Sequence, residues 1–352
     1  MLKMGEEGQL IHETTTESSS LYYNIRNILM KDVSENILEE TPTIQKIVTE
    51  VKEKIKILPI EKNLAYKKAA GVDAGSQILP LASRRYAIIS ALAYRIPEGK
   101  SYFLQPESFS QPYTTSKNRF RNTVDIRRET KLYETASRFI EKNTDTEILL
   151  IDGPLVFSNW WKTAGTERDK QKLLSTVKKL LHQCEDSEIK IVGIVKRPSA
   201  RYLVHHMGLH SQTDLPDSYL LLHTLKTGER TEIFSPRTAL RNVKKPTAFM
   251  DAIDVPIYSF YSRLTRNWHI PAIRIDLPLF ALEYVNEVAD YCYSTSVWNG
   301  LPLPIVKADE EARISKELVG EIYQEILGNI GKKIGNFTHL APYWGEDKWM
   351  GA

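Results

Sequence analysis

Two aspartates stand where an apolar run meets a glycine, in the stretches VDAG (72–75) and IDGP (151–154). The residues before Asp73 and Asp152 read as buried strands, and the glycines predict a tight turn directly after each acid. If these strands are neighbours, both carboxylates emerge at the same edge of a sheet. Two adjacent carboxylates repel one another unless a cation lies between them or a pKa is raised. The pair therefore indicates a divalent metal, although each acid taken alone also fits a turn cap.

A third carboxylate comes from a segment that reads as a helix, residues 118–142. Its apolar residues form one stripe that should face the sheet: Ile126, Tyr133, Ala136 and Ile140. Glu129 falls inside this stripe, whereas Glu134 falls on the solvated face. Because a buried charge needs a partner or a metal, Glu129 is the preferred helix carboxylate.

Basic residues provide the complementary charge. Lys196 ends the apolar strand IVGIVK and is predicted to reach a phosphate at the same sheet edge, although a surface lysine without a role fits equally well. Two further segments, 117–131 and 237–246, are rich in Lys and Arg. Such local patches can neutralise phosphates in a protein whose net charge is only +3. Solvated helix faces are the alternative interpretation.

Histidine and aromatic residues give weaker signals. The histidine cluster contains no Cys or acid, so we expect a solvated helix or loop rather than a zinc site: His205, His206 and His210. Trp160 and Trp161 follow Asp152 and fit either stacking on single-stranded bases or packing under a loop. The C-terminal tail carries aromatic residues that we interpret as a docking segment: Tyr343, Trp344 and Trp349.

The elements that must position these residues follow a mixed α/β order. The predicted strands are GVDAGS, YAIISALAYRIP, SYFLQPESF, 146–154, 190–196, 257–264 and 272–278. The predicted helices are 21–34, 43–58, 118–142, 167–184, 218–229, 279–295 and 309–328. This order predicts an α/β fold whose sheet is covered on both faces, with an elaborated helical second half. We expect a flexible tail over 1–20, one continuous domain over 21–330 with its core at about 65–200 plus C-terminal helices, and a second tail over 331–352.

Composition narrows the class of protein. The 352 residues are 42% hydrophobic and 26% charged, which is ordinary for a globular chain. The sequence has no apolar run long enough for a membrane span and no secretory signal at its start. Cys184 and Cys292 are the only cysteines, which fits a reducing compartment. We therefore expect a cytoplasmic protein.

Seven segments, in this order, carry a family resemblance: GVDAGS (71–76), ILLIDGPL (148–155), IVGIVK (191–196), DSYLLLHTLKTGER (217–230), SFYSRL (259–264), IRIDLP (273–278) and GLPLPIVKADEEARIS (300–315). Each motif is common by itself, but the ordered set over roughly residues 65–320 resembles the NurA nuclease family of archaea and some bacteria. The resemblance implies a ribonuclease-H-like fold in which a first-strand Asp, a helix Glu and an Asp ending a later strand hold metal ions.

The resemblance adds Asp309 to the candidate ligands Asp73, Glu129 and Asp152. Many family members carry His at this position, whereas this chain has Asp309 after Ala308. Asp309 is also predicted to begin helix 309–328, where a carboxylate is a good N-cap. Both roles, metal ligand and cap, remain open. A ligand set made only of oxygen suits Mn²⁺ or Mg²⁺.

The resemblance implies single-strand endonuclease and 5′-to-3′ exonuclease activity in DNA end resection. It also implies a homodimer that encloses single-stranded DNA and duplex ends and works with a HerA-type hexameric ATPase. One alternative is a catalytically impaired DNA-binding module of the same fold. Another is an actin-like ATP-binding protein, because DAGS resembles a phosphate loop. The chain has 17 glycines but no Gly-Gly dipeptide, which argues against such a nucleotide site.

Overall fold

The computed structural model describes residues 2–4, 10–12, 18–81, 83–157 and 164–335. Trp160, Trp161 and the aromatic residues of the C-terminal tail lie outside these described residues. The chain divides into two units, Met1–Glu53 and Lys54–Ala352. The candidate site residues all belong to the second unit. No helix in the described part of the chain is long and apolar enough to cross a membrane.

The first unit consists of two short strands and one long helix. Strands β1 (Leu2–Met4) and β2 (Leu10–His12) pair in antiparallel fashion. Helix α1 runs without a break from Ser18 to Lys54. The prediction of two separate helices, 21–34 and 43–58, was therefore wrong. Pro42 lies inside α1, where proline removes one backbone hydrogen bond but here does not end the helix.

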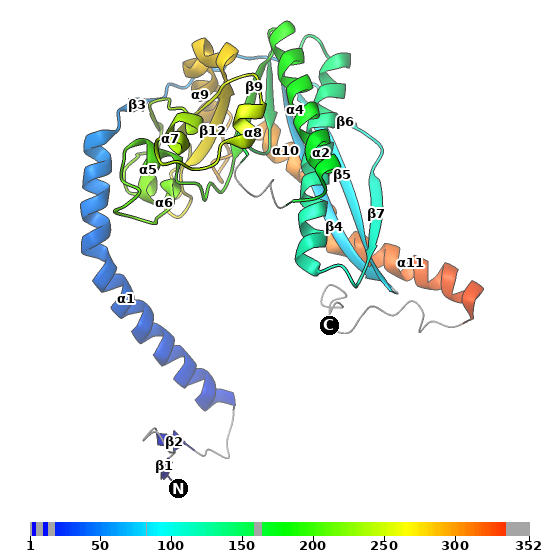
Figure 1. The fold of residues 1–352 in the computed structure, drawn as a ribbon, viewed down its shortest axis with the longest axis horizontal. Helices are drawn as coiled ribbons and strands as arrows, with labels where there is room; N and C mark the ends of the chain where they lie inside the picture. Colours follow the sequence, from blue (N-terminus) through cyan, green and yellow to red (C-terminus); the bar gives the residue numbers. More distant parts are fainter. Residues whose placement is uncertain (1, 5–9, 13–17, 82, 158–163, 336–352) are drawn as a thin grey trace. The chain divides into compact units, whose positions relative to one another are not determined.

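The second unit contains a ten-stranded mixed sheet in the order β3-β10-β11-β12-β9-β8-β4-β5-β6, with β7 also paired to β5 (Figure 1). The strands are β3 (Ile57–Pro59), β4 (Ala69–Leu81), β5 (Arg84–Ile96), β6 (Lys100–Phe103), β7 (Glu107–Pro112), β8 (Ile148–Ile151), β9 (Lys190–Val195), β10 (Glu229–Thr231), β11 (Ile257–Arg263) and β12 (Ile273–Pro278). Strand β8 is parallel to β4 and β9, and the other pairs are antiparallel.

Helices cover both faces of this sheet, as predicted. They are α2 (Lys117–Lys142), α4 (Glu167–Asp186), α5 (Tyr202–His206), α6 (Asp217–Leu222), α7 (Pro236–Asn242), α8 (Ala248–Ala252), the 3-10 helix η1 (Leu279–Tyr284), α9 (Val285–Ser294), α10 (Leu303–Ala312) and α11 (Lys316–Ile334). Helices α2 and α4 lie side by side (Figure 1). Helix α2 packs on β5 through Phe120 and Val124, whereas α10 packs through Ala308 on Leu92 of the same strand.

Alternation along β5 assigns these helices to opposite faces. Ala87 and Ile89 contact α2, and Leu92 contacts α10. Successive side chains of a strand point to opposite faces, so odd and even positions of β5 face different helices. Helix α9 lies on the α10 face, since its residues share a buried cluster with Ile305 of α10. The sheet is thus a middle layer between two helical layers.

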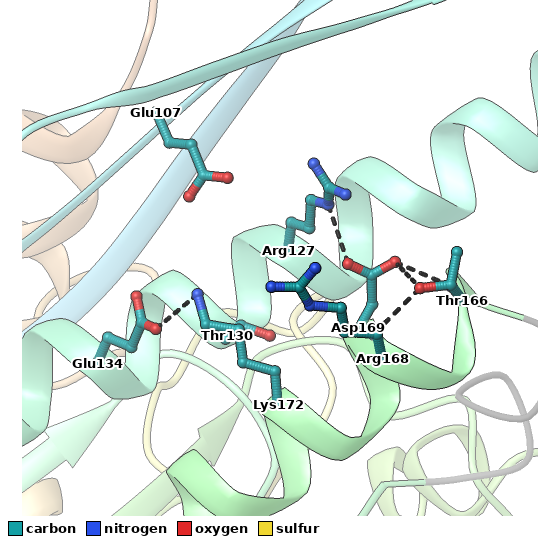
Figure 2. Close-up of a pocket in the computed structure, with 8 residues that line it drawn as sticks. All are labelled: Glu107, Arg127, Thr130, Glu134, Thr166, Arg168, Asp169 and Lys172. Atoms are coloured by element: carbon teal, nitrogen blue, oxygen red, sulfur yellow. Dashed lines mark hydrogen bonds and ion pairs between the residues drawn. The ribbon is translucent and has the colours of Figure 1, made fainter.

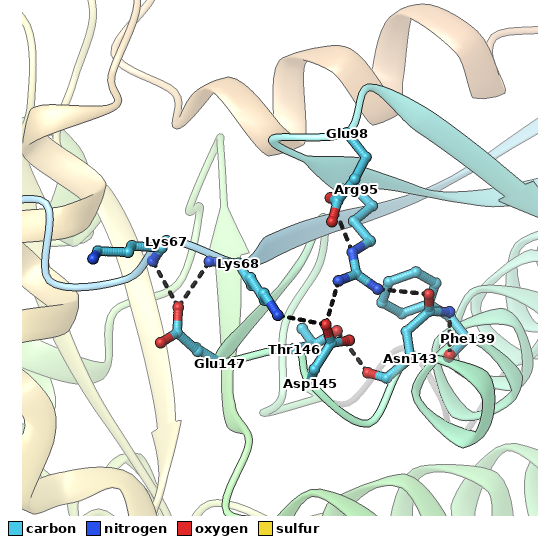
Figure 3. A network of polar contacts seen from close by, with 9 residues as sticks. All are labelled: Lys67, Lys68, Arg95, Glu98, Phe139, Asn143, Asp145, Thr146 and Glu147. Carbon is cyan, nitrogen blue, oxygen red and sulfur yellow. Dashed lines mark hydrogen bonds and ion pairs between the residues drawn. The ribbon is translucent and has the colours of Figure 1, made fainter.

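A network of hydrogen bonds and ion pairs connects the starts of β4 and β8 (Figure 3). Glu147 accepts hydrogen bonds from the backbone N–H groups of Lys67 and Lys68, at 2.6 and 2.7 Å. Arg95 of β5, whose side chain is 9% exposed, contacts Asp145 at 2.8 Å and the side chain of Asn143 at 2.8 Å. Because β4 and β8 are parallel, this network lies at the opposite end of these strands from Asp152. It fixes their register without touching the candidate site.

Other predicted elements also differ from the structure, and the strand predicted for SYFLQPESF is two strands, β6 and β7. Strand β4 continues through Gly75 to Leu81, so the tight turn predicted after Asp73 was wrong. The helix predicted over 218–229 ends at Leu222 as α6. The helix predicted over 309–328 is two helices, α10 and α11, with a break at residues 313–315. Pattern alone gave the right kind of element here but the wrong boundaries.

Candidate metal centre

Three carboxylates from distant parts of the second unit converge. Asp73, Asp152 and Asp309 each offer an oxygen, and these oxygens all lie within 4.8 Å of one another. Val72 of β4 pairs with Ile151 of β8 at the last position of their parallel ladder. The residue that follows each of them in the sequence is an aspartate, Asp73 or Asp152. The backbone N–H of Asp152 still donates to the Val72 carbonyl at 2.8 Å. The structure therefore brings Asp73 and Asp152 to the same point of the sheet.

Helix α10 supplies Asp309 because it lies directly on β4. A Cβ atom at Gly71 would stand 2.1 Å from the Pro304 carbonyl oxygen, and one at Gly75 would stand 2.3 Å from the Ala312 carbonyl oxygen. Only glycine permits such a close approach of backbone to backbone. The glycines of the GVDAGS motif thus serve helix packing rather than a turn, and they bring Asp309 against Asp73.

Asp309 does not cap a helix. Helix α10 begins after Pro302, its N-cap residue, and Asp309 lies well inside its span. The prediction that Asp309 begins a helix was therefore wrong. The signal that could have corrected it was Pro304, since proline is favoured in the first turn of a helix and places the start near Leu303.

Lys196 joins the three acids. It follows β9, and its ammonium group contacts Asp152 and lies 2.6 Å from Asp309 Oδ1. Its side chain is 24% exposed, so Lys196 is not a freely solvated surface lysine. Burial lowers the pKa of Lys196, but Asp152 and Asp309 outweigh this effect and raise it. The ammonium group therefore stays protonated and supplies one positive charge to the three carboxylates.

One positive charge does not neutralise this cluster. Burial, and then the charge of Asp152, raise the pKa of Asp73 to about 8, although Lys196 acts in the opposite direction. The pKa of Asp152 is also raised, mainly by burial. Burial and the neighbouring carboxylate thus both disfavour the charged form of Asp73. Binding of a further cation by these carboxylates would therefore be electrostatically favourable.

Glu129 lies on α2, on the other side of the sheet from α10. It is buried, as predicted, and its Oε1 accepts a hydrogen bond from Arg128 at 2.9 Å. Its Oε2 has no hydrogen-bond partner among the described residues. A Cβ atom at Gly153 would stand 3.5 Å from this Oε2, so Glu129 faces the turn that follows Asp152. Burial raises the pKa of Glu129 even though Arg128 lowers it.

Glu129 is not among the acids whose oxygens lie within 4.8 Å of one another. The alternative helix carboxylate, Glu134, forms an ion pair with Lys172 at 2.8 Å. The sequence pattern did not predict that Arg128 would be the ion-pair partner of the buried Glu129. Glu129 is therefore next to the cluster, with one free oxygen, but not inside it.

These donors fit a hard divalent cation. The three clustered groups are carboxylates, and oxygen ligands suit Mg²⁺ and Mn²⁺ rather than Zn²⁺. The nearby Oε2 of Glu129, which has no hydrogen-bond partner among the described residues, is a further oxygen of the same kind beside this cluster. The residues present thus fit the metal that the family resemblance implies.

A separate pocket of about 220 Å³ lies between α2, α4 and β7 (Figure 2). Its lining residues are Glu107, Arg127, Thr130, Glu134, Thr166, Arg168, Asp169 and Lys172. Arg127 pairs with Asp169 at 3.0 Å, and Lys172 pairs with Glu134. Most of its charges are thus matched within the pocket, and its lining does not include the three clustered aspartates.

Some of the residues in the two predicted basic segments form internal ion pairs. In segment 117–131, Arg127 and Arg128 contact Asp169 and Glu129. In segment 237–246, Arg237 and Arg241 both contact Asp251 at 2.6 Å. The charge available to a phosphate backbone is therefore smaller than the sequence suggests.

The histidine cluster is only partly solvated. His205 is buried, so the expectation of a solvated residue was wrong for it. Burial and then Lys245 lower the pKa of His205 to about 4. The ring is therefore neutral at pH 7 and accepts a hydrogen bond from Lys245 at 3.0 Å. This histidine is a packed structural residue.

Comparison with known proteins gives one family and one fold. A family model described as the NurA domain matches residues 67–314. The crystal structure of the NurA nuclease from Sulfolobus solfataricus matches with a TM-score of 0.60 and 18% identity, over 90% of this chain and 97% of that chain. A crystal structure of NurA with manganese matches with a TM-score of 0.52 and 12% identity, over 85% and 97%.

A crystal structure of NurA bound to dAMP and manganese matches with a TM-score of 0.51 and 13% identity, over 85% of this chain and 94% of that chain. Among curated proteins, no sequence matches this one. The predicted ribonuclease-H-like mixed α/β fold is confirmed. The family model spans most of the chain and includes Asp73, Glu129, Asp152, Lys196 and Asp309. The chain therefore belongs to the NurA family.

Proposed function

We propose that this protein is a metal-dependent DNA nuclease that hydrolyses phosphodiester bonds with Mn²⁺ or Mg²⁺. The observation that carries the proposal is the convergence of Asp73, Asp152 and Asp309, whose oxygens lie within 4.8 Å of one another beside Lys196. Family membership favours this activity over the ATP-binding alternative. Structures of similar proteins contain manganese, and one also contains dAMP, which supports the choice of cation and substrate class.

Each residue has a role in this proposal. Asp73, Asp152 and Asp309 hold the cation, and Glu129 is the adjacent carboxylate with a free oxygen. When bound, such ions neutralise phosphate charge, lower the pKa of a water molecule and stabilise the leaving oxygen. Lys196 carries a fixed positive charge on a partly exposed side chain, so it is placed to bind a phosphate oxygen. Arg128 supplies a positive charge to the buried Glu129 by direct contact.

The first experiment tests whether the cluster is the catalytic site. Asp73→Asn and Asp152→Asn should abolish cleavage of single-stranded DNA in Mn²⁺, and both variants should remain folded. Asp254→Asn is the matched control, because Asp254 is an exposed carboxylate in ion pairs with Lys178 and His182. Wild-type-like cleavage by either cluster variant, with EDTA still inhibiting the wild type, would rule out this site. DNA binding without cleavage by the wild type would favour the impaired-module alternative.

The finer activity is also part of the proposal: single-strand endonuclease and 5′-to-3′ exonuclease action at duplex ends during DNA end resection. Substrates labelled at either end, one blocked at its 5′ terminus and one at its 3′ terminus, give the polarity directly. Equal degradation from the 3′ end would contradict the polarity while leaving the nuclease proposal intact.

We propose a homodimer that works with a HerA-type hexameric ATPase. Support for self-association comes from helix α1, where several large apolar side chains are at least 48% exposed: Leu21, Tyr22, Tyr23, Ile25, Ile28 and Leu29. Exposed apolar surface of this extent usually marks a protein contact. Light scattering that gives a monomer across micromolar concentrations would contradict the dimer, and failure to co-purify with the cognate ATPase would contradict the partnership.

A further inference from the structure

The motif IRIDLP places a charged pair inside the sheet, on β12. The side chains of Arg274 and Asp276 are 4% and 0% exposed. Arg274 Nε donates to Asp276 Oδ1 at 2.8 Å, and its second nitrogen donates to Oδ2 at 3.1 Å. A buried ion pair of this kind seldom stabilises a fold more than apolar residues of similar size would. Stability alone therefore does not explain its presence.

Asp276 makes a contact that reaches the candidate metal centre. Its Oδ2 accepts a hydrogen bond at 3.0 Å from the backbone N–H of Leu155, the third residue after Asp152. Its Oδ1 accepts another from the hydroxyl of Ser259 at 2.7 Å. Arg274 and Ser259 thus hold the carboxylate in one orientation, with Oδ2 directed at the chain that leaves β8.

The turn after Asp152 is confined at two further points. The hydroxyl of Tyr133 on α2 donates a hydrogen bond to the Pro154 carbonyl oxygen. Gly193, which is opposite Asp276 in the β9–β12 register, lies under the turn. A Cβ atom at Gly193 would stand 2.9 Å from the Gly153 carbonyl oxygen and 3.0 Å from the Leu155 nitrogen. The turn therefore has little freedom to move relative to the sheet.

We propose that Asp276 is a positioning residue for the metal centre. Its carboxylate, held by Arg274, fixes the 153–155 turn and thereby the distance from Asp152 to Asp73 and Asp309. This inference rests on the proposed metal-dependent function, because it assigns a role toward the same cluster. Residues outside the ligand set that orient the ligands commonly alter metal affinity by about 10- to 100-fold.

The chain offers a matched control in Asp217. This aspartate is also buried in the second unit, and it accepts three hydrogen bonds, one fewer than Asp276. They come from the backbone N–H groups of Leu203 and Val204, at 2.8 and 2.9 Å, and from the Tyr261 hydroxyl at 2.7 Å. These donors belong to α5 and β11 and not to the turn that follows Asp152, although the charge of Arg274 also acts on Asp217. Asp217→Asn therefore measures how much folding stability is lost when a buried hydrogen-bond network outside this turn is damaged.

The experiment compares Asp276→Asn with Asp217→Asn. The asparagine amide presents one donor group, so it cannot accept from Leu155 and from Arg274 in the same way as a carboxylate. Free energies of unfolding come from urea titration in EDTA, and Mn²⁺ affinity comes from calorimetry without DNA. We expect both variants to lose stability. Only Asp276→Asn should weaken Mn²⁺ binding, by about tenfold or more, with the same shift in the Mn²⁺ concentration for half-maximal cleavage.

A second, milder variant keeps the proposal testable if Asp276→Asn does not fold. Tyr133→Phe keeps the ring and removes only the hydrogen bond to Pro154, so it should fold and show a smaller loss of Mn²⁺ affinity. Wild-type Mn²⁺ affinity in folded Asp276→Asn would overturn the inference. If Asp276→Asn does not fold, wild-type affinity in Tyr133→Phe would overturn it. Wild-type protein that binds no Mn²⁺ would instead refute the proposed function itself.

Discussion

The ammonium group of Lys196 lies 2.6 Å from Asp309 and also contacts Asp152. One lysine thus bridges an acid that follows β8 and an acid carried by α10. These are two of the three acids assigned to the cation in the proposed function. Ammonium and divalent cation are therefore attracted to the same oxygens, and this competition has measurable consequences.

Lys196→Gln should lower the melting temperature of the protein in EDTA and increase the gain in melting temperature on addition of Mn²⁺. Removal of the ammonium leaves the carboxylate repulsion unbalanced, and it also removes a competitor for the cation. Thermal melts with and without Mn²⁺ measure both effects. A smaller Mn²⁺-dependent gain than in the wild type would show that Lys196 supports the cation rather than competing with it.

Asp309→Ala should raise the Mn²⁺ concentration needed for half-maximal cleavage, and Asp309→His should restore part of the loss because imidazole also binds Mn²⁺. Since Asp309 does not cap α10, the Ala variant should not incur the loss of about 1 kcal/mol expected of a missing cap. Metal titration and urea unfolding separate the two effects. An unchanged metal titration would remove Asp309 from the ligand set.

Glu129→Gln should reduce cleavage strongly, whereas Glu134→Gln on the same helix should leave it near the wild-type level. Glu129 faces the turn after Asp152, but Glu134 pairs with Lys172 of α4 in the pocket between α2, α4 and β7. The rate of single-strand cleavage at saturating Mn²⁺ measures the difference. If both variants cleave normally, Glu129 serves only as the buried partner of Arg128.

The contribution of Asp73 to the stability of the metal-free protein should fall as pH rises from about 4 to about 8. Folding raises the pKa of Asp73 from 3.8 to about 8, so the folded state favours the neutral carboxyl group. The stabilisation that this gives below the unfolded-state pKa is lost as pH rises through the folded-state pKa. Urea unfolding in EDTA across this range tests the expectation, and Asp73→Asn should flatten the profile. Mn²⁺ affinity should change in the opposite direction, because the cation needs the ionised form.

Arg95→Met should reduce the free energy of unfolding by about 1–3 kcal/mol without changing the Mn²⁺ titration. The substitution leaves the buried side chain of Asn143 without its Arg95 partner and breaks the contact to Asp145. This network lies at the opposite end of β4 and β8 from the metal centre. A shift in the Mn²⁺ titration would mean that strand register at this end is transmitted to Asp152.

Local pattern predicted the strands that carry Asp73 and Asp152 because each is a short, continuous apolar run, and it placed Glu129 on the inner face of α2 by periodicity. It failed for Asp309 and for the turn after Asp73. The second error has a long-range cause: the glycines at 71 and 75 are required by the approach of α10, more than 200 positions later in the sequence. A glycine needed for distant backbone contact looks the same in sequence as a glycine needed for a local turn.

The contact made by Asp276 is a second feature that the sequence alone could not predict. Its motif is visible in the sequence, but the atom that it contacts is a backbone N–H of Leu155, and backbone donors leave no mark on residue type. The partner of Lys196 was equally hidden, since a lysine at the end of a strand is compatible with any nearby anion. Sequence identified which residues had unusual chemistry, and long-range packing decided what each of them meets.

The seating of α10 on Gly71 and Gly75 has a consequence during synthesis on the ribosome. Strand β4 emerges early, yet the helix that covers it and carries Asp309 is made only after some 230 further residues. Contacts of such long sequence separation form late, because closure of the intervening loop costs entropy before any packing is gained. A nascent or prematurely terminated chain therefore lacks one of the three acids and leaves β4 uncovered. Under the proposed function, nuclease activity would appear only after α10 has been made and has packed on β4.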